Sequence, residues 1–180
     1  MRWGYMVNEK KRKMVLVLCA GELDRALACM NIAVGGASMG MDVTVFCTFF
    51  GLNAIRKDGV APAPRPEEEP KRVGLFGARA LRRAFARLNP GGGKYMNPSR
   101  FSFWGLGRRL MARLMRDSRM ANLDELIKLG SSMGVKFIAC TTSLEALGIP
   151  RDSLRPEVEK FAGVATFLAE AVESDVQLFI

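Results

Sequence analysis

The sequence predicts one α/β domain with three layers and a mainly parallel β-sheet. Two observations lead to this fold class. Short, β-rich apolar segments alternate along the chain with longer segments whose apolar residues recur at helical spacing. The first of them, residues 14–20 (MVLVLCA), is apolar without interruption, which is typical of a strand buried on both faces of a parallel sheet. With 180 residues, of which 49% are hydrophobic, the chain is long and apolar enough for one core.

The N-terminal part predicts a strand–helix–strand unit with a right-handed crossover. Gly21 ends the first strand, and Glu22 and Asp24 occupy the first turn of the helix, where acidic side chains are favoured. Residues 51–57 then look like the opening turns of another helix. The predicted segments are a basic N-terminal arm at 1–13, a strand at 14–20, a helix at 22–39 and a strand at 41–50.

A long insertion is expected from about residue 59 to residue 120. Its start, 58–70, is rich in proline and acidic residues and predicts a loop. The remainder is basic, with glycines at 91–93 and several methionines, so we expect it to be carried on the sheet rather than to form part of it.

Regular patterns return after the insertion. Asn122 and Ser118 are both candidate N-caps for the next helix, which Gly134 would end. The predicted segments are a helix at 122–133, a strand at 135–140, a short helix at 144–147, a strand at 157–162, a helix at 163–174 and a last strand at 176–180.

The net charge of +9 is concentrated in the insertion. Residues 101–120 predict a basic amphipathic helix, and residues 78–88 repeat the pattern more weakly. Such helices lie on anionic membranes or dock acidic partners. Alternatively, the apolar face packs on this domain or on a neighbouring subunit. Binding to nucleic acid is not expected, because no recognised motif accompanies the basic residues.

Several absences narrow the chemistry. The chain has no histidine, which excludes Cys–His and Ser–His nucleophile pairs, and no CxxC pair, so we expect no metal site. The first strand–helix turn, CAGELDRA, matches neither GxGxxG nor a P-loop, so we expect no nucleotide or flavin cofactor. No secretory signal is visible, which predicts a cytoplasmic protein, with membrane association through the insertion as an option.

The cysteines are the candidate reactive groups. Three of them, Cys19, Cys47 and Cys140, lie at or near the carboxyl ends of predicted strands, where sites form in parallel sheets. Cys29 lies among alanines within a helix and is expected to pack. Cys140 is the strongest candidate, because backbone N–H groups at the following strand–helix turn would favour its thiolate. A thiolate can hold sulfane sulfur as a persulfide, with Cys19 and Cys47 as candidate auxiliary thiols.

Three segments of the chain resemble the DsrE/DsrF-like superfamily, and specifically its stand-alone, peroxiredoxin-labelled branch. They are LVLCAGELDRALACMNIAVGGASMGMDVTVFCTFFGLNAIRK, LDELIKLGSSMGVKFIACTTSLEALGI and GVATFLAEAVESDVQLFI, about two-thirds of the chain. Relatives use a cysteine at a strand end as a persulfide carrier, in a motif of the form Cys-x7-Gly-[Ile/Val]. Here the motif reads Cys140-Thr-Thr-Ser-Leu-Glu-Ala-Leu-Gly148-Ile149, which places the acceptor cysteine on Cys140.

The resemblance implies a flavodoxin-like sheet, homo-oligomers, and sulfur exchange with TusA-like or rhodanese-like partners. The chain also departs from the family. Leu147 stands where relatives often have arginine, and Cys19 where many have serine or threonine, so a resolving role for Cys19 is not implied. A peroxidatic site also needs a nearby arginine, and the motif supplies only the hydroxyl residues 141–143.

Two functions from different classes are therefore weighed. The first is a sulfur carrier or sulfurtransferase that loads Cys140, in a pocket shaped by neighbouring residues (Gly21, Thr141, Thr142, Ser143 and Glu145). The second is a non-enzymatic oligomeric interaction module, in which Cys140 only packs and the insertion is presented to a membrane surface or an acidic partner.

Overall fold

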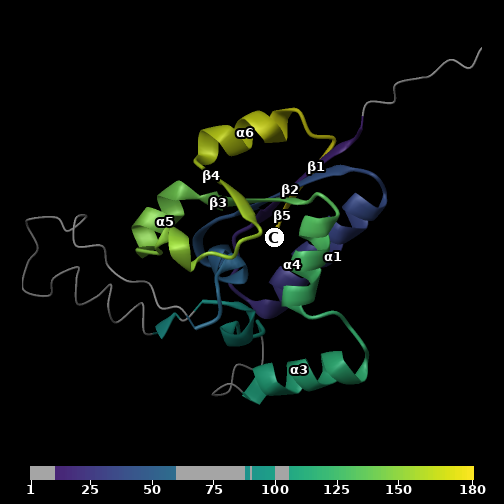
Figure 1. Ribbon diagram of the computed structural model, residues 1–180, viewed down its shortest axis with the longest axis vertical. Coiled ribbons are helices and arrows are strands. Elements are labelled where there is room, and N and C mark those ends of the chain that lie inside the picture. Colours follow the sequence, from purple (N-terminus) through teal and green to yellow (C-terminus); the bar gives the residue numbers. More distant parts are fainter. Residues whose placement is uncertain (1–10, 60–87, 90, 100–105) are drawn as a thin grey trace, which may run out of the picture.

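Five parallel strands form one sheet in the computed structural model, which describes residues 11–59, 88–89, 91–99 and 106–180 (Figure 1). The strand order is β4-β3-β2-β1-β5, and every neighbouring pair is parallel, as predicted. The strands are β1 (Lys13–Leu18), β2 (Asp42–Cys47), β3 (Lys136–Cys140), β4 (Val158–Ala162) and β5 (Val176–Phe179).

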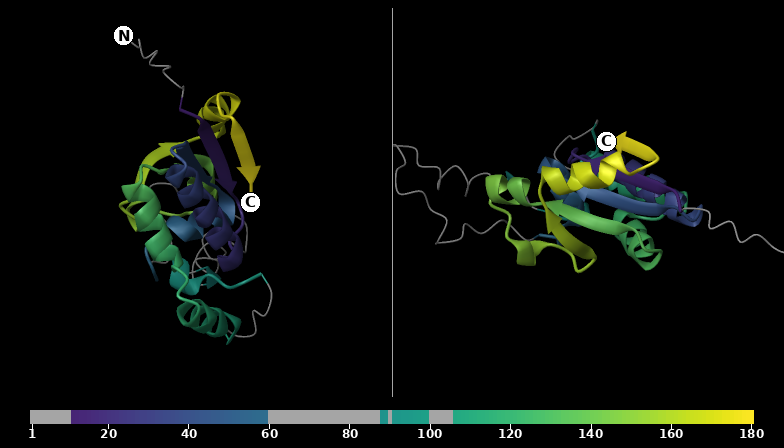
Figure 2. Two further views of the ribbon diagram at one scale, coloured as in Figure 1. Left: turned by 90° about the vertical axis from the view of Figure 1, so that its right-hand side faces the viewer. Right: turned by 90° about the horizontal axis from the view of Figure 1, so that it is seen from above.

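The described helices lie on both sides of this sheet and beyond one end of it (Figures 1 and 2). The α-helices are α1 (Leu23–Ser38), α3 (Leu106–Asp117), α4 (Leu123–Ser132), α5 (Thr141–Leu147) and α6 (Val164–Val172). Three short 3₁₀ helices join them: η1 (Phe49–Ile55), η3 (Gly93–Tyr95) and η5 (Arg151–Ser153). Within the described ranges, no helix is both long enough and apolar enough to cross a membrane.

The two faces of the sheet bury different sets of side chains, because alternate residues of a strand point to opposite faces. On one face, the larger core joins α1 and α4 to strand residues such as Leu16, Val45 and Cys47. On the other face, a smaller cluster contains Val17, Phe46, Ile138, Cys140 and Ala162. Phe167 of α6 covers this cluster and stacks on Phe46 with ring centroids 4.9 Å apart. Cys47 and Cys140 therefore lie on opposite faces of the sheet.

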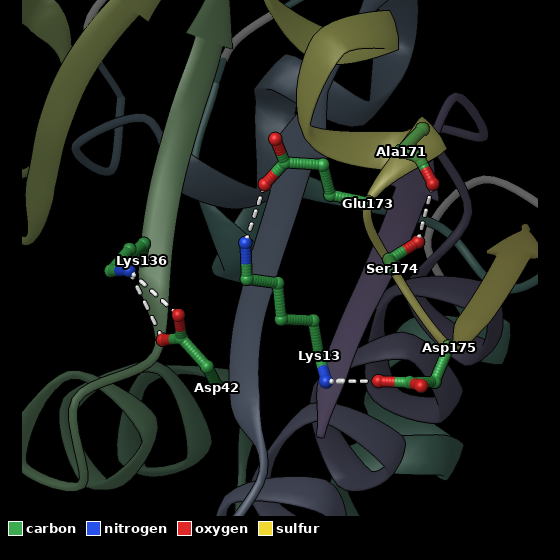
Figure 3. Close-up of polar contacts among 7 residues, drawn as sticks. All are labelled: Lys13, Asp42, Lys136, Ala171, Glu173, Ser174 and Asp175. Atoms are coloured by element: carbon green, nitrogen blue, oxygen red, sulfur yellow. Dashed lines mark hydrogen bonds and ion pairs between the residues drawn. The ribbon is translucent and has the colours of Figure 1, made fainter. Parts of the chain in front are cut away.

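Ion pairs tie the strands together at the amino edge of the sheet, away from the cysteines (Figure 3). The Lys13 ammonium lies 2.7 Å from the Glu173 carboxylate, and the backbone N–H of Lys13 donates to Asp175. The Lys136 ammonium lies 3.0 Å from Asp42, which joins β3 to β2. Exposed pairs of this kind each contribute little to stability, so burial of the strands is the main source of it.

Most predicted elements are confirmed, with ends that differ by a few residues. Asn122, rather than Ser118, caps α4: its side chain accepts from the N–H of Glu125, and the Glu125 carboxylate accepts from the N–H of Asn122. The short helix after Cys140 begins at Thr141 rather than at Leu144. Residues 51–57, predicted to open a helix, belong mostly to the 3₁₀ helix η1, and Arg56 then pairs with Leu154 as an isolated bridge.

The described parts of the predicted insertion contact the carboxyl side of the sheet and α1. The N–H of Leu23 donates to the carbonyl of Asn97, and Ser99 hydrogen-bonds the Asp24 carboxylate through its backbone and its hydroxyl. The basic amphipathic helix is present as α3, beyond the end of α4. Residues 1–10 of the predicted arm at 1–13, most of the weaker helix at 78–88 and residues 101–105 lie outside the described residues. The last residue of the predicted arm, Lys13, begins β1 instead.

The three glycines at 91–93 give this segment a close approach to the domain. Gly91 covers Arg56, which is fully buried, and a Cβ atom on Gly91 would lie 2.3 Å from the Arg56 Nε. Gly92 has a φ of +97°, which favours glycine, and packs on Asp58. The Arg56 guanidinium donates to the side chain of Asn53 and to the carbonyl of Asn89, so a buried cation joins η1 to the middle of the insertion.

Candidate functional site

Three cysteines lie along the same edge of the sheet, as predicted. Cys47 ends β2 and Cys140 ends β3, while Cys19 directly follows β1. Because these three strands are neighbours in a parallel sheet, their carboxyl ends are side by side. The edge thus holds three thiols, and their surroundings differ in charge stabilisation, burial and access.

Cys140 is held by hydrogen-bond donors from two segments that are far apart in sequence. It occupies the N-cap position of α5, so the first turn of that helix follows it immediately. Ser143 in this turn is buried, and its hydroxyl oxygen lies 2.8 Å from that of Thr48, which is also buried and follows β2. The thiol is therefore surrounded by two hydroxyl groups and the first backbone N–H groups of α5.

These donors change the acidity of the thiol. Burial alone would raise the pKa of Cys140, but hydrogen bonds from the side chain and backbone of Ser143, from the Thr48 hydroxyl and from the Thr142 backbone outweigh it. The net result is a pKa below that of an ordinary thiol. A larger thiolate fraction at neutral pH makes a cysteine a better nucleophile towards sulfur, so Cys140 is suited to thiol exchange.

Access to Cys140 is restricted. The residue is only 1% exposed and belongs to the small cluster that Phe167 of α6 covers. A donor molecule or partner thiol can reach the sulfur only if these covering side chains move. The outer side of α6 is itself apolar and exposed at Val164, Leu168 and Val172.

Cys47 and Cys29 lie in a different environment from Cys140. Both are fully buried in the larger core on the opposite face of the sheet. Burial raises the pKa of Cys29 to about 12, and burial together with the proximity of Cys29 raises the pKa of Cys47 well above its ordinary value. Cys29 therefore packs, as predicted. Cys47 shares the edge of the sheet with Cys140 but not its face or its donors.

Cys19 is the partly exposed thiol of the four. It lines a cavity of about 610 Å³ at the carboxyl ends of β1 and β5, together with Gly21. Gly21 allows Phe50 to approach closely, since a Cβ atom at position 21 would lie 2.7 Å from the Cβ of Phe50. Gly21 was predicted to shape the Cys140 pocket, whereas the structure places it beside Cys19.

The predicted pocket residues after Cys140 differ in their contributions. Ser143 contributes its side chain and backbone and Thr142 its backbone, whereas the side chains of Thr142 and Glu145 are exposed. Thr141 is partly exposed. Among the described residues, no group of three acidic or cysteine side chains could hold a metal ion.

Thr48 is the site residue that the sequence analysis missed. Its position gave one signal, because it directly follows a predicted strand whose carboxyl end lies at the same edge as that of Cys140. Nothing in the sequence indicated that its hydroxyl would meet Ser143.

Comparisons with known proteins agree with this fold. Residues 10–179 match the DsrE/DsrF/DrsH-like family. The chain is 32% identical to YrkE, an uncharacterised protein of Bacillus subtilis, over 97% of this chain and all of that one. It is 28% identical to the sulfur carrier protein DsrE2 of Allochromatium vinosum, over 95% of this chain and 99% of that one.

Among solved structures, YchN of Escherichia coli is similar, with a TM-score of 0.52 at 10% identity over 95% of this chain and all of that one. This likeness concerns the fold alone. The match across nearly the whole chain, together with the parallel sheet and its cysteine-bearing edge, shows that the chain belongs to the DsrE/DsrF/DrsH-like family.

Proposed function

We propose that this protein is a sulfur carrier that holds sulfane sulfur as a persulfide on Cys140 and passes it to a partner thiol. One observation carries the proposal: the paired hydroxyls of Ser143 and Thr48, with backbone N–H groups of α5, lower the pKa of Cys140 despite its burial. A merely packing cysteine, such as Cys29, has its pKa raised by burial. Membership in the DsrE/DsrF/DrsH-like family and the similarity to a sulfur carrier protein support the same role.

The transfer needs no redox partner. The Cys140 thiolate attacks the terminal sulfur of a donor persulfide, R–S–SH; the new S–S bond forms as the donor's S–S bond breaks, and the donor thiol leaves as R–SH after taking up a proton. Delivery is the same exchange in the opposite direction: a partner thiolate attacks the terminal sulfur held on Cys140, a new S–S bond forms on the partner, the S–S bond at Cys140 breaks, and Cys140 leaves as the thiolate. The hydroxyls of Ser143 and Thr48 stabilise the thiolate at the start and at the end of this cycle.

Membership in the family and the similarity to a sulfur carrier protein support partner proteins that exchange sulfur with Cys140. TusA-like or rhodanese-like proteins, with a mobile or exposed thiol of their own, would be donor and acceptor. The exposed apolar side chains of α6 and of β5, including Leu168 and Phe179, support a homo-oligomer that covers this side of the sheet.

The proposal is tested by intact-mass analysis of the full chain after incubation with a persulfidated rhodanese-like protein. We expect one added sulfur per chain, reversed by reductant and lost in Cys140→Ser. The matched control is Cys47→Ser, which removes a thiol from the same edge of the sheet but from the opposite face. If Cys140→Ser gains sulfur as wild type does, and mapping places none on Cys140 in wild type, the proposal is wrong.

A second candidate is an interaction module, and it rests on the exposed face of α3. Gly107, Met111 and Met115 pack towards the domain, whereas the adjacent stripe of Leu106, Leu110 and Leu114 is more than half exposed. Arg109, Arg113 and Arg116 flank this stripe. A leucine row bordered by arginines is suited to the surface of an anionic bilayer.

Cosedimentation with vesicles tests this second candidate. We expect binding to vesicles that contain phosphatidylserine and not to vesicles of phosphatidylcholine alone. Replacing Leu110 and Leu114 together with glutamine should abolish binding, whereas Leu129→Gln, at an exposed leucine of α4, should not. Equal binding of all three proteins, or binding of none, would exclude a role for α3 at a membrane.

A further inference from the structure

The cavity beside Cys19 has the position and size of a small-molecule site. It lies outside the carboxyl ends of β1 and β5, where α/β sheets bind ligands. Its volume of about 610 Å³ is within the range of ligand pockets, roughly 300–1,000 Å³. Residues of β5, of the turn after β1 and of the segment around Asn89 form its walls. Cys19 is in the wall and partly exposed, so a molecule in the cavity would meet a thiol.

The polar groups of the cavity indicate what kind of molecule would fit. Asn89 is one of the wall residues, and its Oδ1 accepts a hydrogen bond from the Asn53 side chain. Glu22 and Arg25 add one negative and one positive charge to the same walls. A molecule with both an ammonium and a carboxylate group matches this pair.

Cys19 and Cys140 are separate positions rather than a disulfide pair. β2 lies between their strands, so their backbones are about 10 Å apart, beyond the reach of a disulfide. The turn after β2 also lies between them. The N–H of Thr48 donates to the carbonyl of Leu18 and the N–H of Gly51 donates to that of Cys19, while the Thr48 side chain belongs to the Cys140 site.

We propose that this cavity binds the persulfide of an amino-acid or short-peptide thiol and that Cys19 accepts its sulfane sulfur. The inference extends the proposed sulfur-carrier function by adding a second acceptor with a different donor class: Cys19 takes sulfur from small molecules, and Cys140 from proteins. In the transfer step the Cys19 thiolate attacks the terminal sulfur of R–S–SH. The Cys19–sulfur bond forms, the donor's S–S bond breaks, and R–SH leaves with a proton.

Binding is tested first, without sulfur transfer, by using S-methylglutathione as an unreactive probe. The full chain is alkylated with iodoacetamide, and the rate at Cys19 is followed by peptide mass spectrometry. We expect saturating probe to slow alkylation of Cys19 and to leave the rate at Cys140 unchanged. Arg25→Gln should weaken this protection roughly tenfold, the effect of losing one charge-assisted hydrogen bond. Lys128→Gln, which removes an exposed charge from α4, is the matched control. Equal Cys19 rates with and without the probe would overturn the proposed site.

Transfer is then tested with glutathione persulfide on wild type, Cys19→Ser and Cys140→Ser. We expect the Cys19 peptide to carry one added sulfur in wild type and in Cys140→Ser. If Cys140 of the wild type gains sulfur, but Cys19 carries none in the wild type or in Cys140→Ser, the inference fails and the carrier function of Cys140 stands. If Cys19 loads while Cys140 is loaded by neither small nor protein donors, the inference stands and the proposed function of Cys140 fails.

Discussion

The hydroxyl oxygens of Thr48 and Ser143 lie 2.8 Å apart, and both groups are close enough to Cys140 to lower the pKa of its thiol. Each hydroxyl has one proton, so when one donates to the other only the second can donate to the sulfur. Either oxygen can be the donor between the two hydroxyls. We predict that Thr48 donates to Ser143 and Ser143 to the thiolate, because Ser143 also holds the sulfur through its backbone N–H. Such a chain polarises its last donor and strengthens the bond to sulfur.

Removing the last donor should make Cys140 less acidic. In Ser143→Ala we expect the pKa of Cys140 to rise, so that the alkylation rate at pH 7 falls roughly tenfold, the effect of losing a hydrogen bond to a charged group. The measurement is the pH profile of iodoacetamide labelling at the Cys140 peptide. Thr142→Val is the control, because this exposed residue contributes through its backbone, which valine retains. Superimposable profiles for wild type and Ser143→Ala would contradict the assignment.

Removing the first donor should have a smaller effect in the same direction. Thr48→Val keeps the shape of the side chain and leaves the Ser143 hydroxyl free to donate to sulfur, although without the polarisation that Thr48 supplies. We expect its labelling profile to lie between those of wild type and Ser143→Ala. A larger shift for Thr48→Val than for Ser143→Ala would mean that the chain runs in the opposite direction, with Thr48 as the donor to sulfur.

Substitution by alanine should change the free energy of unfolding in opposite directions at two glycines. In Gly91→Ala the new Cβ would lie 2.3 Å from the Nε of the buried Arg56, which Asn53 and Asn89 hold in place. We expect the free energy of unfolding to fall by about 2 kcal/mol or more. Gly35 is exposed within α1 with open space around it, so Gly35→Ala should raise the free energy of unfolding by about 0.5–1 kcal/mol. Urea unfolding of both variants measures the contrast, and equal stability would show that Arg56 can move aside.

The elements that the sequence predicted well are those set by local patterns. The apolar run before Cys140 fixed the position of β3, and Asn122 with Glu125 formed the predicted start of α4. The segment after β2 was predicted less well. Residues 51–57 have the composition of an α-helix, but most of them form the tighter 3₁₀ helix η1, which ends just before the buried Arg56. Local propensity does not show where a buried cation finds its partners.

In the candidate site, too, residues that are close in sequence were predicted and a residue that is distant in sequence was missed. Cys140 and Ser143 are close in sequence and were both identified, whereas Thr48 is 95 residues from Ser143 and meets it only because β2 and β3 are neighbours. The cavity at Cys19 likewise depends on Asn89, which lies within the insertion and contacts η1 through Asn53. Contacts of this kind require the strand order and the path of the insertion, and a single sequence supplies neither.

The buried thiol of Cys29 should make the protein less stable at alkaline pH. Burial raises its folded-state pKa to about 12, so the folded protein keeps this proton while the unfolded chain releases it from about pH 9 upward. The stabilising contribution is complete below pH 9 and is lost as the pH rises towards 12, by up to about 1.4 kcal/mol per pH unit.

Urea unfolding of wild type and Cys29→Ala between pH 8 and pH 10.5 measures this loss. The two proteins should differ in slope as well as in stability, since alanine has no proton to lose. Met30→Leu, a buried change in the same helix without a titrating group, should keep the wild-type slope. A Cys29→Ala protein that loses stability with pH as steeply as wild type would show that the thiol is not the group responsible.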